Sequence, residues 1–315
     1  MPMNSLPLLF FALAAVAAEP GTLEEHKNRA RTLLEQQDFA AALDEARAVK
    51  RFSADDIEGY QLTAAAHLGR GNYDEAEKAI QWMLDLRIGK ADAKGWLLVA
   101  RFREVTGDLG GAIEAVNLSY VRLAATQTRE ARALMVYSGR LHCMAGELAL
   151  ATRVLEDVLK AAPQDPGALE ALARVRLAQG KWDAAVGLLR ELAHTSPHPR
   201  HLYELAEATR DRVDWDAFET AARARIATPD NANRELVLYL AGTAGRAAAA
   251  EALAIARGES ARRHDVLTLD ALAAALLANG RAAEAKSVIE RVLAVGTCHP
   301  EILARAAHLG VKPQP

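Results

Sequence analysis

Hydrophobic residues recur every three or four positions along most of the chain, which is the spacing of one face of an α-helix. Two such stretches lie on either side of Gly180, and the second ends before Pro197. They predict two helices of about 13 residues each, joined at a glycine turn and closed by a proline. The hydrophobic positions are Leu169, Leu172, Ala173 and Leu177, followed by Trp182, Ala185, Val186, Leu189 and Leu192. This segment therefore predicts a helical hairpin with small residues at its centre.

The same hairpin pattern returns along the chain. The copies share a turn residue, usually glycine, and an alanine five positions later, except that Phe218 stands at this place in the copy at Val213. Successive copies begin 32 to 39 residues apart. A period of this length predicts a stacked array, because one hairpin cannot bury its hydrophobic stripe alone. The turns begin at Gln37, Gly71, Gly107, Gly146, Gly180, Val213, Gly245 and Gly280. The copies at Val213 and Gly245 diverge most, so we expect the sixth and seventh repeats to be irregular.

These positions resemble the tetratricopeptide repeat family over residues 22–296. Matching residues include Tyr60, Trp96, Ala64, Ala100, Gly139, Ala173, Pro163 and Pro197. The resemblance implies an all-α, right-handed superhelical solenoid of about eight hairpins, drawn out as one curved row whose first helices line a concave groove. The last apolar stripe, residues 299–310, predicts a capping helix. The solenoid is thus expected over 19–310, with a disordered tail at 311–315.

Arginines occupy one repeated position of the predicted first helices. Arg101, Arg140 and Arg174 each lie six residues before the turn glycine of their repeat, and Arg31 has the same place in the first repeat. Equivalent positions of consecutive repeats stack, so these residues predict a ladder of guanidinium groups, which bind carboxylates by two hydrogen bonds. Because the resemblance implies a peptide-binding groove, we expect a protein or peptide partner with acidic groups. Further candidates for this surface are Lys27, Tyr203 and Arg210.

Neighbouring glutamates allow a second interpretation of the same arginines. Glu104 follows Arg101 by three residues, and Glu170 precedes Arg174 by four, so pairs within one helix can form. Exposed pairs of this kind contribute only about 0–1 kcal/mol. The sequence leaves open whether the arginines bind a ligand or form a solvated, self-paired stripe.

Signals for catalysis are sparse. His194, His198 and His201 have spacings at which three imidazoles can hold zinc if they converge, and a metal-dependent hydrolase at this cluster is the minor alternative. The sequence has no nucleophile-elbow, zinc-protease, phosphate-loop or dinucleotide-binding motif. We therefore predict that the protein is not an enzyme and uses no cofactor.

The first 18 residues differ from the rest of the chain. The run from Leu6 to Ala18 has no charge, and it is shorter than the ~20 residues of a membrane-spanning helix. The small residues at 15–17 match the cleavage pattern of a secretory signal. We expect a signal peptide over 1–18 and a mature chain in the periplasm or outside the cell, with no membrane span. An uncleaved anchor or a disordered apolar tail are the alternatives.

The composition is that of an ordinary soluble chain. Hydrophobic residues make up 51% and charged residues 25%, and the net charge of −3 gives no reason to expect nucleic-acid binding. The abundance of alanine and arginine is typical of bacterial sequences. Cys143 and Cys298 are expected to be separate free thiols. We predict an exported scaffold that binds a partner in its groove. The alternative is a self-associating structural subunit of an envelope assembly or secretion complex.

Overall fold

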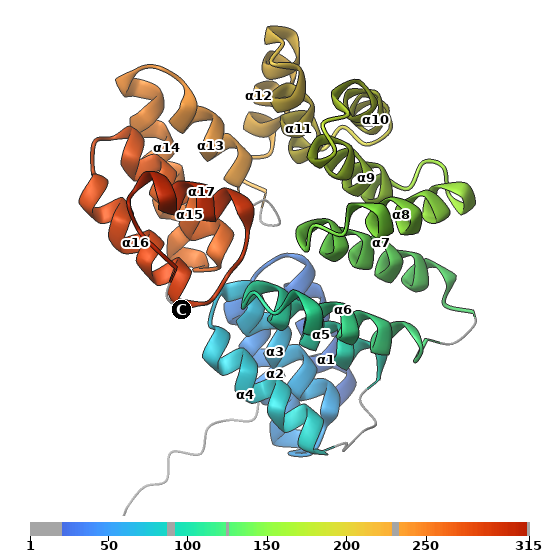
Figure 1. Ribbon diagram of the computed structural model, residues 1–315. Helices are drawn as coiled ribbons and strands as arrows, with labels where there is room; N and C mark the ends of the chain where they lie inside the picture. The colour runs from blue at the N-terminus through green and yellow to red at the C-terminus, as the bar shows by residue number, and fades with distance from the viewer. Residues whose placement is uncertain (1–20, 87–91, 124–125, 229–232, 314–315) are drawn as a thin grey trace, which may run out of the picture.

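The computed structural model describes residues 21–86, 92–123, 126–228 and 233–313. Within these ranges the chain consists of helices and their connections, without strands, and it confirms the predicted all-α solenoid of eight hairpins and a capping helix (Figure 1). The predicted signal peptide at 1–18 lies outside the described residues. The helices are α1 (Leu23–Glu35), α2 (Phe39–Phe52), α3 (Ile57–Arg70), α4 (Tyr73–Leu86), α5 (Ala93–Val105), α6 (Leu109–Tyr120), α7 (Thr128–Met144), α8 (Leu148–Ala161), α9 (Pro166–Ala178), α10 (Trp182–Thr195), α11 (Pro199–Thr209), α12 (Arg212–Ala224), α13 (Arg234–Gly242), α14 (Arg246–Arg262), α15 (Val266–Ala278), α16 (Ala282–Ala294) and α17 (Pro300–His308).

Turn and cap residues define most hairpins as predicted. The turn glycines of five repeats have φ between 71° and 85°, a left-handed conformation that glycine adopts without a steric penalty. Aspartates cap several first helices; the Asp92 side chain, for example, accepts a hydrogen bond from the Gly95 backbone at the start of α5. The alanine five positions after the turn is fully buried in six repeats, where it lets neighbouring helices approach closely. These alanines are Ala42, Ala76, Ala112, Ala151, Ala185 and Ala285.

The sixth and seventh repeats are irregular, as expected. Their first helices, α11 and α13, have 11 and 9 residues, against 13 for α9 and α15. In the sixth repeat the left-handed turn residue is Arg210, with φ 54°, rather than Val213, which lies inside α12. In the seventh, Gly245 caps the start of α14 instead of ending α13. Phe218 replaces the buried alanine of the sixth repeat and packs against the rings of Tyr203, Trp215 and Tyr239.

The row of hairpins does not stay open, which differs from the expected extended trough. Repeats stack on their sequence neighbours, but the curvature brings the last repeats back to the first ones, so the molecule closes into a ring (Figure 1). The backbone N–H of His264, after α14, donates to the carbonyl oxygen of Arg70, at the end of α3, over 2.6 Å. An elongated array with separate ends is therefore the wrong picture of this solenoid.

Two details at the edges of the repeats also differ from expectation. Trp182, one of the hydrophobic positions of the predicted hairpin, is 59% exposed. The predicted disordered tail begins at Val311, but Val311 is buried in the hydrophobic core of the last repeats and donates its N–H to the Ala306 carbonyl. Residues 314–315 lie outside the described part of the chain. Cys143 and Cys298 are free thiols. None of the described helices has the length and apolar character of a membrane span.

Candidate functional site

The first helices of the hairpins line the inside of the ring. In Figure 1, α9, α13 and α15 lie closer to the centre than their partners α10, α14 and α16. The arginine ladder predicted from the sequence belongs to this inner surface, because Arg31, Arg101, Arg140 and Arg174 lie on α1, α5, α7 and α9. The inner surface is therefore the candidate binding site, and the state of each cation on it decides what it can bind.

Three of the four ladder arginines form ion pairs with glutamates. Arg31 pairs with Glu58 of the next first helix, with Nη2 2.6 Å from Oε1. Arg140 reaches back to Glu104 of the preceding first helix, with an Nη2–Oε1 distance of 3.4 Å. Most of this pairing joins one repeat to the next, so these arginines stabilise the stacking of the first helices.

Arg174 is the most heavily paired of the ladder arginines. It contacts Glu170 within α9, as the second interpretation of the sequence expected, over 2.8 Å, and it also contacts Glu204 of α11. The other expected pair within one helix, Arg101 with Glu104, does not form. Instead Glu104 accepts a hydrogen bond of 2.6 Å from the Tyr137 hydroxyl and pairs with Arg140.

Arg101 differs from the rest of the ladder. Within the described residues it has no ion-pair partner, and the same holds for Lys94, two turns earlier on α5. The two cations line a small hollow of about 180 Å³ together with the paired Arg31 and Glu58, and the lining includes the apolar residues Leu97 and Ala65. This combination of uncompensated positive charge and apolar surface is suited to an acidic segment with hydrophobic neighbours.

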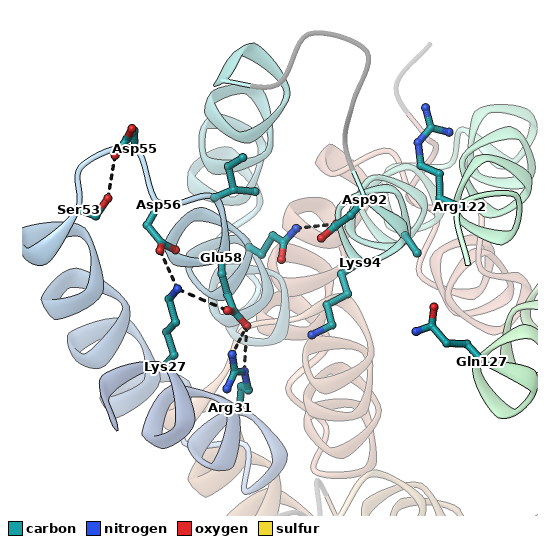
Figure 2. A pocket seen from close by; sticks show the side chains of 13 residues that line it. Lys27, Arg31, Ser53, Asp55, Asp56, Glu58, Asp92, Lys94, Arg122 and Gln127 are labelled. Atoms are coloured by element: carbon teal, nitrogen blue, oxygen red, sulfur yellow. Dashed lines mark hydrogen bonds and ion pairs between the residues drawn. The ribbon is translucent and has the colours of Figure 1, made fainter. Parts of the chain in front are cut away.

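A second, larger hollow adjoins the first at the edge of the inner surface. It has a volume of about 690 Å³ and is open to solvent. Figure 2 shows Lys94 projecting into it without a partner, opposite the connected group of Lys27, Asp56, Glu58 and Arg31. The residues that line it are Lys27, Arg31, Ser53, Asp55, Asp56, Ile57, Glu58, Gln61, Asp92, Ala93, Lys94, Arg122 and Gln127.

The three further candidates for the groove have other surroundings. Lys27 is buried and pairs with Asp56 over 2.7 Å, so it holds α1 against the start of α3. Tyr203 belongs to the aromatic cluster around Phe218. Arg210 is exposed, but it is the turn residue that ends α11 and lies beyond the helical stretch of the ladder. The structure does not bring these residues together with Arg101.

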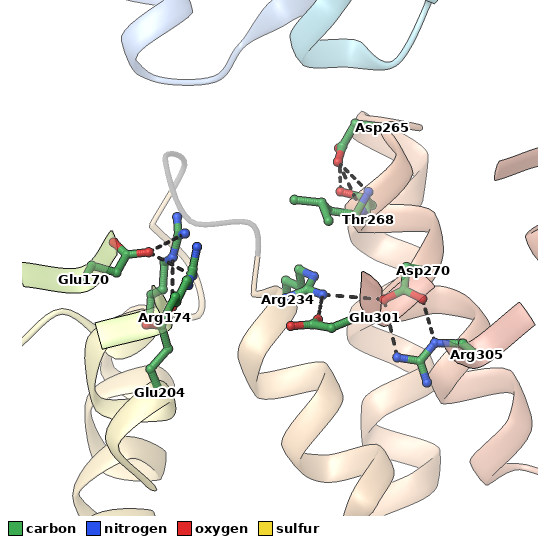
Figure 3. A network of polar contacts seen from close by, with 11 residues as sticks. Glu170, Arg174, Glu204, Arg234, Asp265, Thr268, Asp270, Glu301 and Arg305 are labelled. Atoms are coloured by element: carbon green, nitrogen blue, oxygen red, sulfur yellow. Dashed lines mark hydrogen bonds and ion pairs between the residues drawn. The ribbon is translucent and has the colours of Figure 1, made fainter. Parts of the chain in front are cut away.

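The second half of the inner surface carries denser ion-pair networks (Figure 3). Burial alone would raise the pKa of Glu170, but His201, Arg200 and Arg174 beside it outweigh burial and lower the pKa to about 2. Glu170 is thus ionised and compensated at neutral pH. A separate network in Figure 3 contains Asp270 of α15, which has no exposed surface and binds Arg305 of α17 over 2.6 Å. These carboxylates and guanidinium groups pair with one another within the protein.

The histidine cluster does not form a metal site in the structure. No group of three His, Cys, Asp or Glu side chains converges as metal ligands within the described residues. His201 is engaged elsewhere: its Nδ1 lies 2.7 Å from the Ser196 carbonyl oxygen, and its Nε2 lies 3.7 Å from Glu170 Oε2. His198 contacts the His201 ring, with centroids 5.7 Å apart.

Comparison with known proteins settles the family. Models of the tetratricopeptide repeat match residues 62–128 and 144–208. The chain contains tetratricopeptide repeats. Among solved structures, a chain of the APC/C hetero-tetramer Cut9-Hcn1 has a TM-score of 0.52 at 14% identity, covering 92% of this chain. PilW, titled a widely conserved type IV pilus biogenesis factor, has a TM-score of 0.50 at 15% identity, covering 67% of this chain and 96% of its own.

These likenesses concern the repeat fold alone, because the identities are low. This tetratricopeptide repeat chain spans half of the matched Cut9-Hcn1 chain. No curated protein matches the sequence. A scaffold for protein–protein interaction is consistent with this repeat fold.

Proposed function

We propose that this protein is an exported scaffold that binds an acidic segment of another protein on its inner surface, centred on α5. The observation that supports the proposal most directly is the unbalanced charge of Lys94 and Arg101 beside an apolar floor. Arg31 lines the same hollow, and its pair with Glu58 is partly exposed, so a ligand carboxylate can compete for this guanidinium at low cost.

The chemistry of the hollow defines the ligand class. Guanidinium and ammonium groups bind carboxylates through charge-assisted hydrogen bonds, which are stronger than neutral ones. Leu97 and Ala65 between them favour an aliphatic side chain next to the acidic group. The ligand of this surface is therefore a peptide segment in which glutamate or aspartate alternates with apolar residues.

The charge of Arg101 provides the test. A fluorescent peptide of alternating glutamate and leucine is expected to bind about tenfold more weakly to the Arg101→Glu variant, because one charge-assisted contact contributes about 1.5–3 kcal/mol. Added salt is expected to weaken the wild-type complex. Fluorescence anisotropy measures both effects.

The matched control is Arg190→Glu, which makes the same charge change at an exposed position of the outer helix α10. This variant is expected to keep the wild-type affinity. Equal affinities of the two variants, or equal binding of a glutamine analogue of the peptide, would contradict the proposed acidic ligand.

Export rests on the uncharged run from Leu6 to Ala18 and the small residues that follow the apolar core of this run. Expression of the full chain in a bacterial host is expected to give a mature protein that begins near Glu19 in the periplasmic fraction. N-terminal sequencing of the purified protein measures the start. A chain with Met1 intact in the cytoplasmic fraction would remove the export part of the proposal and leave the binding surface unaffected.

A further inference from the structure

The ring is closed by contacts between two opposite rims of the solenoid. One rim consists of the hairpin turns, and the other consists of the loops that join one hairpin to the next. The turns of the first three hairpins meet the loops before α15 and before α17 (Figure 1). We call these contacts the latch; on the turn rim it comprises residues 37–39, 70–73 and 106–107, and on the loop rim 263–266 and 296–298.

Hydrogen bonds form the first part of the latch. The carbonyl oxygen of Arg70 accepts from the His264 N–H over 2.6 Å. The Tyr73 hydroxyl oxygen accepts from the Val266 N–H over 3.0 Å. Val266 is the first residue of α15, where backbone N–H groups have no partner within the helix, so Tyr73 of the second repeat supplies part of the cap of the eighth. The Arg263 guanidinium also lies over the Phe39 ring, 5.7 Å from its centroid.

The second part of the latch is a close approach between the backbones of the two rims. A Cβ on Gly71 would lie 2.3 Å from the His264 carbonyl carbon, and a Cβ on Gly107 would lie 2.2 Å from the Gly296 carbonyl oxygen. The equivalent turn residues Gly146 and Gly180 have no atom within 4 Å of such a Cβ. The first two glycines therefore serve a purpose beyond the turn: they permit contact with the far end of the chain.

The latch differs physically from the interfaces between consecutive repeats. Most of those interfaces bury leucine and alanine side chains along whole helices, whereas the latch combines hydrogen bonds, one cation–aromatic contact and backbone approach with the packing of two partly buried side chains, Tyr73 and Val105, against the C-terminal core. Interfaces with little buried apolar area open at the lowest free-energy cost. The latch therefore opens more readily than the extensive interfaces between neighbouring hairpins, while the hairpins remain folded.

We propose that the latch regulates access to the inner surface. When it is closed, helices surround the inner surface, and a ligand can enter only along the axis of the ring, as a free chain end does. When it is open, an internal segment or a folded helix can enter from the side. This regulation concerns the same surface as the proposed function and rests on it, but the opening of the ring is measurable without any ligand.

Four glycine variants separate ring opening from turn strain. Gly71→Ala, Gly107→Ala, Gly146→Ala and Gly180→Ala all place a side chain at a left-handed turn position, with φ between 72° and 85°. Only the first two force a methyl group into the opposite rim. Small-angle X-ray scattering is expected to show a larger radius of gyration for Gly71→Ala and Gly107→Ala than for the two controls.

Labelling of the inner surface tests access directly. Arg101→Cys is introduced with Cys143→Ser and Cys298→Ser, and the thiol is reacted with N-ethylmaleimide or with a maleimide that carries a long polyethylene glycol chain. Adding Gly107→Ala is expected to speed the reaction of the large reagent several-fold and to leave the small reagent unaffected. Adding Gly146→Ala is expected to change neither rate.

A third latch variant, in addition to Gly71→Ala and Gly107→Ala, is needed if the added methyl group disturbs folding. Circular dichroism would reveal such a disturbance. Tyr73→Phe removes the hydrogen bond to Val266 without adding volume or strain, and it is expected to shift scattering and labelling in the same direction, by less. Equal scattering and equal labelling rates across the latch variants and the controls would overturn the latch. Failure of glutamate-peptide binding with an intact ring response would overturn the proposed ligand alone.

Discussion

Replacing Phe218 with alanine is expected to lower the free energy of unfolding by about 3–5 kcal/mol, the usual cost of emptying a fully buried phenylalanine site. Phe218 has no exposed surface, and the rings of Tyr203, Trp215 and Tyr239 surround it with centroids 5.3, 6.0 and 5.5 Å away. These rings come from α11, α12 and α13, so the site lies at the junction of the sixth and seventh repeats. A cavity there cannot be filled by one neighbour without disturbing the other two.

The position of Phe218 also predicts how the variant unfolds. Repeat arrays lose cooperativity when one interface between neighbours is weakened. Because α13 has few contacts with α11 and α12 apart from this cluster, we expect the urea transition followed by circular dichroism to broaden or split. The matched control is Phe52→Ala, since Phe52 is 54% exposed and should change stability by no more than about 0.5 kcal/mol. Equal losses for the two variants, with sharp transitions in both, would contradict this role of the cluster.

Periodicity predicted most of the fold because it reports packing directly. The alanine five positions after the turn is fully buried in six repeats, and its return at a spacing of 32 to 39 residues requires the same contact in those hairpins. The prediction from this pattern was wrong in the sixth repeat, where a residue other than the aligned one forms the turn. In the sixth repeat Arg210 adopts the left-handed conformation, an uncommon choice for a long side chain, and the turn moves three residues from the aligned Val213.

Ring closure could not be predicted from one sequence, and the reason is a different one. The angle between consecutive hairpins is small, and its sum over eight of them decides whether the ends meet. No residue pattern in the sequence indicates the sum of these angles. Gly71 and Gly107 look like Gly146 and Gly180 in the sequence, and only the arrangement in space separates the packed pair from the open pair.

The sequence predicted which helices carry the ladder arginines, but it predicted their ion pairs only in part. The ladder position correctly placed the arginines on first helices, but it did not indicate which of them were neutralised. The partners lie about one repeat away in the chain, as Glu58 does from Arg31 at 27 residues and Glu204 from Arg174 at 30. A search for opposite charges at the repeat period, rather than within one helix, would have found these pairs and left Arg101 as the exception.

Replacing Asp270 with alanine is the second change with a large expected effect, a loss of about 3–5 kcal/mol in the free energy of unfolding. The Asp270 carboxylate has no exposed surface, and Arg305 of α17 donates to both of its oxygens, over 2.6 and 3.3 Å. Arg234 of α13 approaches it to 3.5 Å. Removing the carboxylate leaves the largely buried Arg305 guanidinium without its charge partner, whereas Arg234 keeps its pair with Glu301 over 2.5 Å. An uncompensated buried charge of this kind costs more than the pair itself contributes.

A double variant distinguishes this cause from a simple loss of packing. Asp270→Leu is expected to be strongly destabilising, and adding Arg305→Met should recover part of the loss, because the second change removes the uncompensated Arg305 charge. Asp157→Ala is the surface control: it breaks the exposed pair with Lys160 and should cost no more than about 1 kcal/mol. Urea unfolding of the wild type, Asp270→Leu, Arg305→Met and the double variant measures the coupling. Additive losses from the two substitutions would show that Asp270 does not hold α17 through charge, and the anchor of the capping helix would then be its apolar contact through Ile302.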